Sequence, residues 1–139
     1  MKRKTHPQSY LLVLIFFLFG CSILHNQQNK LFTLKDAWYQ SWMISEQEKG
    51  TIVTILLSDV EKDIVFDSVV FRGVQMPLNS EIKDGNTILT CNLNREQSRL
   101  MDDKETPVDK PNQIMYRYKG EKKTYIIESI RREEMKYRK

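Results

Sequence analysis

The chain has 139 residues, a length that suits a single domain. Apolar residues make up 40% of it and charged residues 29%, which excludes both a disordered polymer and a polytopic membrane protein. The formal net charge of +4 raises the question of nucleic-acid binding. Two cysteines and two histidines are too few for a disulfide scaffold or an all-protein zinc cluster, so we expect no cofactor.

The beginning of the chain has the order of a secretory signal. A positive segment at Lys2, Arg3 and Lys4 precedes an apolar run from Tyr10 to Gly20. At 1.5 Å per residue this run covers only about half of the ~30 Å hydrocarbon core, so a stable spanning helix is disfavoured. A positive flank, a short apolar run and a small residue together predict a signal peptide.

Leu18-Phe19-Gly20-Cys21 resembles the lipobox of bacterial lipoproteins. In that family the Cys thiol receives a diacylglyceryl group, the signal is cut just before the Cys, and the new amine is usually acylated. Radioactive palmitate is incorporated into such acyl chains and so labels the lipidated protein. The resemblance implies cleavage between Gly20 and Cys21 and lipidation of Cys21. Phe19 departs from the family, which prefers a small or aliphatic residue there. The alternatives are a cleaved signal without lipid and a retained membrane anchor.

Removal of the signal changes the charge argument. Three of the 22 basic residues leave with it and no acidic residue does, so 19 basic residues against 18 acidic ones leave +1. We therefore expect no nucleic-acid partner. The remaining basicity is concentrated near the C-terminal end, where we interpret Arg131 to Lys139 as a solvated tail. A contact with anionic lipid headgroups is the alternative.

The body of the chain alternates apolar, β-branched and aromatic runs with turn signals at short intervals, which predicts an all-β fold. We expect a small antiparallel β-sandwich of about seven strands, immunoglobulin-like or related, over residues 34–139. It follows a signal over residues 1–20 and a lipidated cysteine and tether over residues 21–33. The predicted strands are Ala37–Ser45, Thr51–Ser58, Ile64–Arg72, Met76–Ile82, Thr87–Leu93, Gln113–Lys119 and Lys122–Ile130. Apolar residues on both sides of Thr51–Ser58 predict a central strand that is covered on both faces.

Turn chemistry predicts two hairpins. A type II′ turn centred on Gly120-Glu121 would place the apolar side chains of both its strands on one face. Its register pairs Tyr118 with Lys123, Tyr116 with Tyr125, and Ile114 with Ile127. A type I′ turn at Asp84-Gly85 would direct Leu89, Cys91 and Leu93 toward the core. Its register pairs Ile82 with Thr87, Ser80 with Leu89, and Leu78 with Cys91.

The search for a catalytic set gives negative results. His25 is the one histidine left after signal removal, and it lies in the tether, so a Ser-His-Asp or Cys-His arrangement is disfavoured. Cys91 alternates with core leucines and is interpreted as a packing residue. We therefore expect a protein that is not an enzyme. Two acidic clusters are interpreted as solvated loops, with calcium binding as the alternative. They comprise Asp59, Glu61 and Asp63, and Asp102, Asp103, Glu105 and Asp109.

Two candidate binding surfaces remain. Trp38 and Trp42 share one face of a predicted strand, and we favour core packing for them over an exposed platform for a sugar or a protein. Asp102 and Asp103 open a polar loop over residues 102–112, which contains two prolines. Long loops of this kind often carry the function of a β-sandwich.

The segments Ala37–Trp42 and Phe66–Gly73, with the last hairpin, resemble an uncharacterised group of small Bacteroidetes lipoproteins, which has no activity to carry over. We expect a lipid-anchored cell-envelope protein, a binding or structural module held on the membrane by its anchor and engaging an envelope protein. An inhibitor or accessory subunit of an envelope enzyme is one alternative, and a carbohydrate-active enzyme that uses acidic residues is another. No acidic residue lies between Cys21 and Lys30. In the lipoproteins that the chain resembles, surface export tends to need acidic residues just after the Cys, so the resemblance implies the outer membrane, facing the periplasm, with the cell surface as the alternative.

Overall fold

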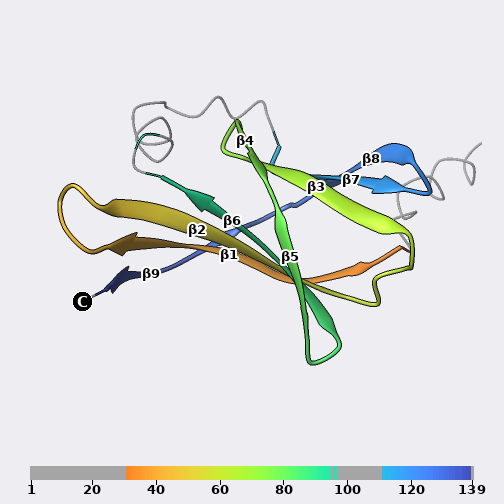
Figure 1. The fold of residues 1–139 in the computed structure, drawn as a ribbon, viewed down its shortest axis with the longest axis horizontal. Helices are drawn as coiled ribbons and strands as arrows, with labels where there is room; N and C mark the ends of the chain where they lie inside the picture. Colours follow the sequence, from red (N-terminus) through yellow and green to blue (C-terminus); the bar gives the residue numbers. More distant parts are fainter. Residues whose placement is uncertain (1–30, 95, 97–110, 139) are drawn as a thin grey trace, which may run out of the picture. The chain divides into compact units, whose positions relative to one another are not determined.

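The computed structural model of the chain describes residues 31–94, 96 and 111–138. The predictions on the signal, on Cys21 and on Asp102 and Asp103 lie outside these residues. Within them, strands form two sheets that face each other (Figure 1). The five-stranded sheet has the order β5-β6-β2-β1-β9, and the four-stranded sheet has the order β4-β3-β7-β8. The protein is therefore an all-β sandwich, as the sequence predicts.

The bounds of the strands lie within four residues of the predicted ones except in two places, and the largest of these shifts are at the start of β1 and the end of β8. They are β1 (Thr33–Met43), β2 (Lys49–Ser58), β3 (Ile64–Phe71), β4 (Val74–Pro77), β5 (Asn79–Lys83), β6 (Asn86–Leu93), β7 (Gln113–Tyr118), β8 (Glu121–Ile126) and β9 (Arg131–Tyr137). The predicted strand Met76–Ile82 is two strands, because the chain passes from one sheet to the other at Pro77 and Leu78. The second difference is β9, which the sequence pattern does not predict.

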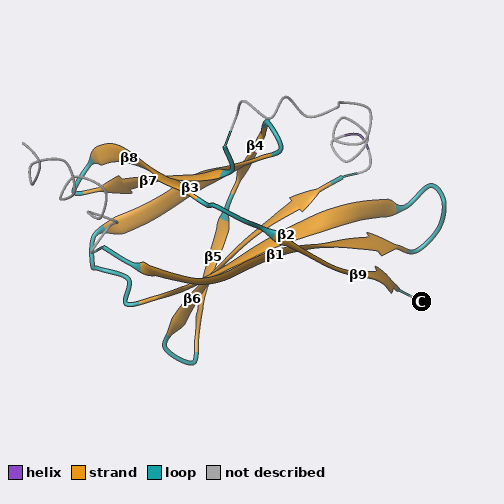
Figure 2. Ribbon diagram, turned by 180° about the vertical axis from the view of Figure 1, so that it is seen from behind, coloured by secondary structure: helices purple, strands orange, loops and turns teal. Residues whose placement is uncertain are grey.

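The strand order is that of an immunoglobulin-like Greek key. The order β5-β6-β2-β1 corresponds to strands D-E-B-A, and β3-β7-β8 corresponds to C-F-G. β4 adds a strand beside C, and β9 adds a parallel strand beside A. The chain crosses from the four-stranded to the five-stranded sheet between β8 and β9 (Figure 2).

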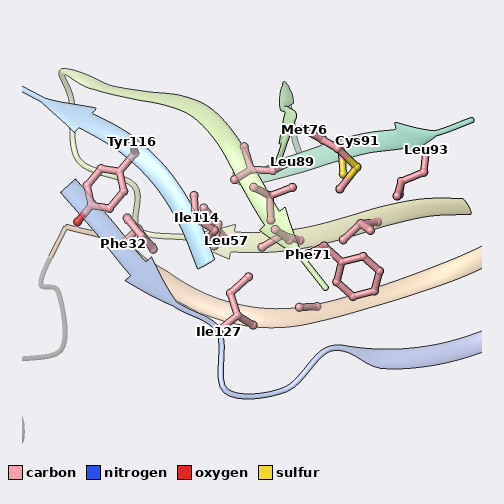
Figure 3. Packing of buried hydrophobic residues seen from close by; sticks show 14 residues of the cluster. Phe32, Leu57, Phe71, Met76, Leu89, Cys91, Leu93, Ile114, Tyr116 and Ile127 are labelled. Carbon is pink, nitrogen blue, oxygen red and sulfur yellow. The ribbon is translucent and has the colours of Figure 1, made fainter. Parts of the chain in front are cut away.

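The core lies between the inner faces of the two sheets (Figure 3). Strand alternation puts Val53, Ile55 and Leu57 of β2 on the inner face, where all three are 0% exposed. The core comprises Phe32, Ala37, Val53, Ile55, Leu57, Val69, Phe71, Met76, Leu89, Cys91, Leu93, Ile114, Tyr116 and Ile127. Phe32 falls within the predicted tether, but its ring packs against that of Tyr116, with 5.3 Å between the ring centroids. The ordered domain therefore begins earlier than residue 34.

β2 is central, as predicted, but the prediction that both of its faces are covered is wrong. β2 lies between β1 and β6 within its sheet. Its outer side chains Ile52, Thr54 and Leu56 are only half-buried. The sheet has one partner sheet, so one face of β2 packs in the core and the other faces outward.

The Asp84-Gly85 hairpin is confirmed. Both residues have positive φ, 51° and 76°, as a type I′ turn requires, and Ile82 pairs with Thr87. Ser80 pairs with Leu89, and the ladder ends at the pair Asn79 and Thr90. The predicted pair of Leu78 with Cys91 is absent from the described ladder, because Leu78 belongs to the crossing between the sheets.

The last hairpin has the predicted faces but not the predicted register. Its turn is Lys119-Gly120, with φ of 49° and 83°, so Tyr118 pairs with Glu121 rather than Lys123. The turn is type I′, and the register differs from the predicted one by two residues. A shift of two residues preserves the alternation, so Ile114 and Tyr116 still share their inward face with Tyr125.

The C-terminal segment is largely exposed, as predicted, but residues 131–137 form the strand β9 and not a tail. β9 pairs with β1 in parallel, with Trp38 beside Arg131 and Met43 beside Tyr137. Two side-chain contacts join the strands. The Arg131 guanidinium donates to both carboxylate oxygens of Asp36 at 3.2 and 2.8 Å, and Gln40 Nε2 donates to the Glu134 carbonyl at 2.9 Å. The hydrogen bonds from Arg131 hold the pKa of Asp36 below its usual value.

Candidate binding surface on the five-stranded sheet

The outer face of the five-stranded sheet carries apolar side chains where an exposed sheet face usually carries polar ones. Strand pairing aligns this face in rows across β1, β2 and β6. One row contains Trp38, Thr54 and Thr90, and the next contains Gln40, Ile52 and Asn92. The flanking rows are Trp42 with Gly50, and Asp36 with Leu56 and Ile88. We call the outward side chains of β1, β2 and β6 together with Arg131, Lys136 and Arg138 the tryptophan face.

Trp42 lies over a glycine. A Cβ at Gly50 would be 2.8 and 2.9 Å from two carbon atoms of the Trp42 ring, so the absence of a side chain allows the ring to lie against the strand. The Trp42 indole N–H donates to Asn92 Oδ1 at 3.4 Å. The Arg138 guanidinium carbon lies 5.4 Å from the ring centroid, within cation–π range. Contacts from β2, β6 and Arg138 thus fix the ring.

Trp38 has a similar arrangement further along β1. The Arg131 guanidinium carbon is 5.3 Å from the Trp38 ring centroid. Arg131 is itself oriented by Asp36 and by an ion pair with Glu133. Each tryptophan is therefore accompanied by an arginine from the C-terminal segment, and β9 is the element that supplies Arg131.

These positions correct the interpretation of the two tryptophans as core residues. Trp38 and Trp42 are half-buried, and neither belongs to the core cluster or packs against it as Tyr39 does. Their strand neighbour Tyr39 points inward, with its ring centroid 5.2 Å from that of Phe71. The sequence predicts the alternation of β1 correctly but assigns the two sides of the strand the wrong way round.

The other candidate residues form no reactive site among residues 31–94, 96 and 111–138. Cys91 is buried as predicted, and burial raises the pKa of its thiol to about 11, so it stays protonated at neutral pH. Asp59, Glu61 and Asp63 are exposed in the β2–β3 connection. In the described part of the chain no three His, Cys, Asp or Glu side chains converge as metal ligands. No helix in that part is long and apolar enough to cross a membrane.

Searches of protein families, curated proteins and solved structures find no match to this chain.

Proposed function

We propose that this protein is a lipid-anchored, non-enzymatic binding module of the bacterial cell envelope that docks a protein partner on the tryptophan face. The observation that carries the proposal is the placement of Trp38 and Trp42 on the solvent side of the sheet, each beside an arginine. Tryptophan and arginine are among the residues most enriched at positions that dominate protein–protein binding energy.

The outer faces of the two sheets differ in chemistry. The tryptophan face has Ile52, Leu56 and Ile88 between its polar positions, all half-buried. The outer face of the four-stranded sheet carries the exposed ion pair of Arg117 with Asp67, at 2.9 Å, and beside it the exposed Val65, but no tryptophan. What distinguishes the tryptophan face is therefore the pair of tryptophans with their arginines, rather than apolar area alone.

A protein partner is favoured over a sugar because an arginine guanidinium lies over each tryptophan ring. Trp42 has Gly50 on one side and the Arg138 guanidinium within 5.4 Å of its centroid. Trp38 has Arg131 within 5.3 Å. A sugar that stacks on these rings would have to displace the guanidinium groups, whereas a protein surface can contact the arginines and the ring edges together.

Charge complementarity favours an acidic partner. Lys136 lies beside Trp42 in the β1–β9 ladder, and neither Lys136 nor Arg138 forms an ion pair with any carboxylate in the described ranges. Complementary charges around an apolar centre raise the association rate and select the partner. We therefore propose that the partner presents carboxylates around an apolar patch.

The docking proposal is tested by site-specific photo-crosslinking in living cells. A photoreactive phenylalanine at Thr90, in the middle of the tryptophan face, is expected to give a discrete crosslinked band, because its neighbours Thr54 and Trp38 lie in the contact. The matched control carries the same group at Thr124, on the four-stranded sheet. In the Thr90 protein, Trp38→Ala with Trp42→Ala should reduce the band at least about tenfold. The exposed control Ile126→Ala should leave it unchanged. Equal bands from Thr90 and Thr124 would contradict the docking site.

The lipid anchor is tested by metabolic labelling with radioactive palmitate. We expect label in the wild-type protein and none in Cys21→Ser, because the thioether at Cys21 precedes acylation in the family that the signal resembles. Cys91→Ser serves as the control, since the other cysteine of the chain is buried in the domain. Label that persisted in Cys21→Ser would exclude lipidation at that residue.

A further inference from the structure

A small cavity opens between β1, β2, β9 and the β3–β4 turn, and Trp42 and Gly50 are among the residues that line it. Its volume is about 200 Å³, and its lining includes Tyr39 and Ser41 from β1 and Lys49 and Thr51 from β2. Arg72 from the β3–β4 turn and Arg132 from β9 complete the polar lining. Residues of both sheets thus meet at this cavity, which we call the cationic pocket.

The charges around the cationic pocket are unbalanced. Lys49, Arg72 and Arg132 all line it, and no Asp or Glu does. In the parts of the chain that the structure describes, none of the three forms an ion pair with a carboxylate. Like charges that share a cavity repel, so their convergence costs free energy that a bound anion would offset.

Arg72 is held in place before any ligand binds. Its Nη2 donates to the Tyr39 hydroxyl at 2.9 Å, and its guanidinium carbon lies 5.0 Å from the Tyr39 ring centroid. Its backbone N–H donates to Asn112 Oδ1 at 3.0 Å. The backbone of Arg72 is left-handed, with φ of 48°, as part of the tight turn between β3 and β4. A guanidinium fixed in this way loses little conformational freedom when it binds an anion.

Hydroxyl donors complete the set. The Tyr39 oxygen accepts from Arg72, so the hydrogen of its own hydroxyl is available to donate. The Ser41 and Thr51 oxygens are 3.4 Å apart and share at most one hydrogen bond between them, which leaves one hydroxyl hydrogen for a ligand. Three cations and two hydroxyl hydrogens match a group with several oxygens and two negative charges better than a single carboxylate.

From this arrangement we propose that the cationic pocket binds a phosphate monoester group, with Arg72 and Arg132 contacting its oxygens and Lys49 adding charge. The group could belong to a soluble phosphate ester or to a lipid headgroup, since the pocket recognises the phosphate itself. The side chains that would bind the phosphate, among them Arg72, Arg132 and Lys49, are not members of the tryptophan face, although Trp42 also lines the pocket.

The proposal is tested by calorimetric titration of the detergent-solubilised full chain with inorganic phosphate and, separately, with dihexanoyl phosphatidic acid. We expect saturable binding that Arg132→Gln weakens about tenfold, which is the loss of one charge-assisted hydrogen bond. Arg72→Gln combined with Arg132→Gln should abolish it. Lys62→Gln combined with Lys83→Gln removes the same charge elsewhere and should leave binding intact. Arg132 is exposed, so its single variant keeps the test valid if substitution of Arg72 impairs folding.

Each outcome bears on the proposal. Stronger binding of the lipid than of phosphate assigns the headgroup as the source, and equal binding assigns a soluble ester; both support the pocket. Equal losses in the two double variants would mean diffuse attraction and would overturn it. Absence of saturable binding of either probe to the wild-type chain would also overturn it.

Discussion

Replacement of Leu57 by alanine is expected to lower the free energy of unfolding by about 2–5 kcal/mol, because it removes a large side chain from the middle of the core. Leu57 is 0% exposed, at the inner face of the central strand β2, where the two sheets meet. Its removal leaves a cavity that the surrounding strands cannot close. Urea unfolding of the solubilised full chain, followed by circular dichroism, measures the loss.

The adjacent leucine provides a matched control. Leu56 has the same side chain and the same strand but points outward, where it is half-buried between Asp36 and Ile88. Leu56→Ala is therefore expected to cost less, about 1–2 kcal/mol, since its side chain lies at the surface and its removal leaves no closed cavity. If both variants lost the same stability, the assignment of inner and outer faces of β2 would be wrong.

This pair shows where the sequence is informative and where it is not. Alternation along β2 separates Val53, Ile55 and Leu57 from Ile52 and Leu56, but both sets are apolar. Hydropathy alone therefore predicts cover on both faces. Whether one or both faces of β2 are covered depends on how many sheets the whole chain forms. The sequence of a single strand does not contain this information.

The tryptophans show the same limit more sharply. Strand alternation correctly groups Trp38, Gln40 and Trp42 on one face of β1. Because large aromatic rings are usually buried, the two tryptophans lead to the prediction that this face packs in the core, whereas it is the outward face of β1. The pairing of Ala37 with Ile55 and of Tyr39 with Val53 decides it, because residues that are directly opposite share a face.

Hairpins are predictable to the extent that their turns are. Asp84-Gly85 is a strong type I′ signal, and the register next to it is correct. At the other hairpin, Lys119 adopts the left-handed conformation, which is uncommon for a residue other than glycine, asparagine or aspartate, so the predicted turn lies one residue late. The strand β9 has no signal of its own. Its parallel partner β1 lies about 90 residues earlier in the chain, and its polar sequence has no strand alternation to detect.

Replacement of Gly50 by alanine is the second large effect we expect, and it links the fold to the binding surface. A Cβ at this position would lie 2.5 Å from the Leu93 carbonyl oxygen, which belongs to the backbone and cannot move away cheaply, and 2.8 Å from the Trp42 ring. We expect a loss of about 1–3 kcal/mol in unfolding free energy from this overpacking. In a Trp38→Phe background Trp42 is the sole tryptophan, so its fluorescence emission should shift to longer wavelength as the ring is displaced.

The control for Gly50→Ala is Gly85→Asn, because Gly85 has φ of 76° and a Cβ added there would have no atom within 4 Å. Asparagine tolerates the left-handed conformation, so this change should cost less than about 1 kcal/mol and leave the Trp42 emission unchanged. The contrast separates two reasons for a glycine: Gly85 allows a turn, whereas Gly50 makes room for a ring. If Gly50→Ala left both stability and emission unchanged, Trp42 would not depend on Gly50 for its position. That result would mean that the Gly50 contact does not fix the Trp42 ring. A docking surface that is formed before the partner binds would then no longer explain why a glycine lies beneath Trp42.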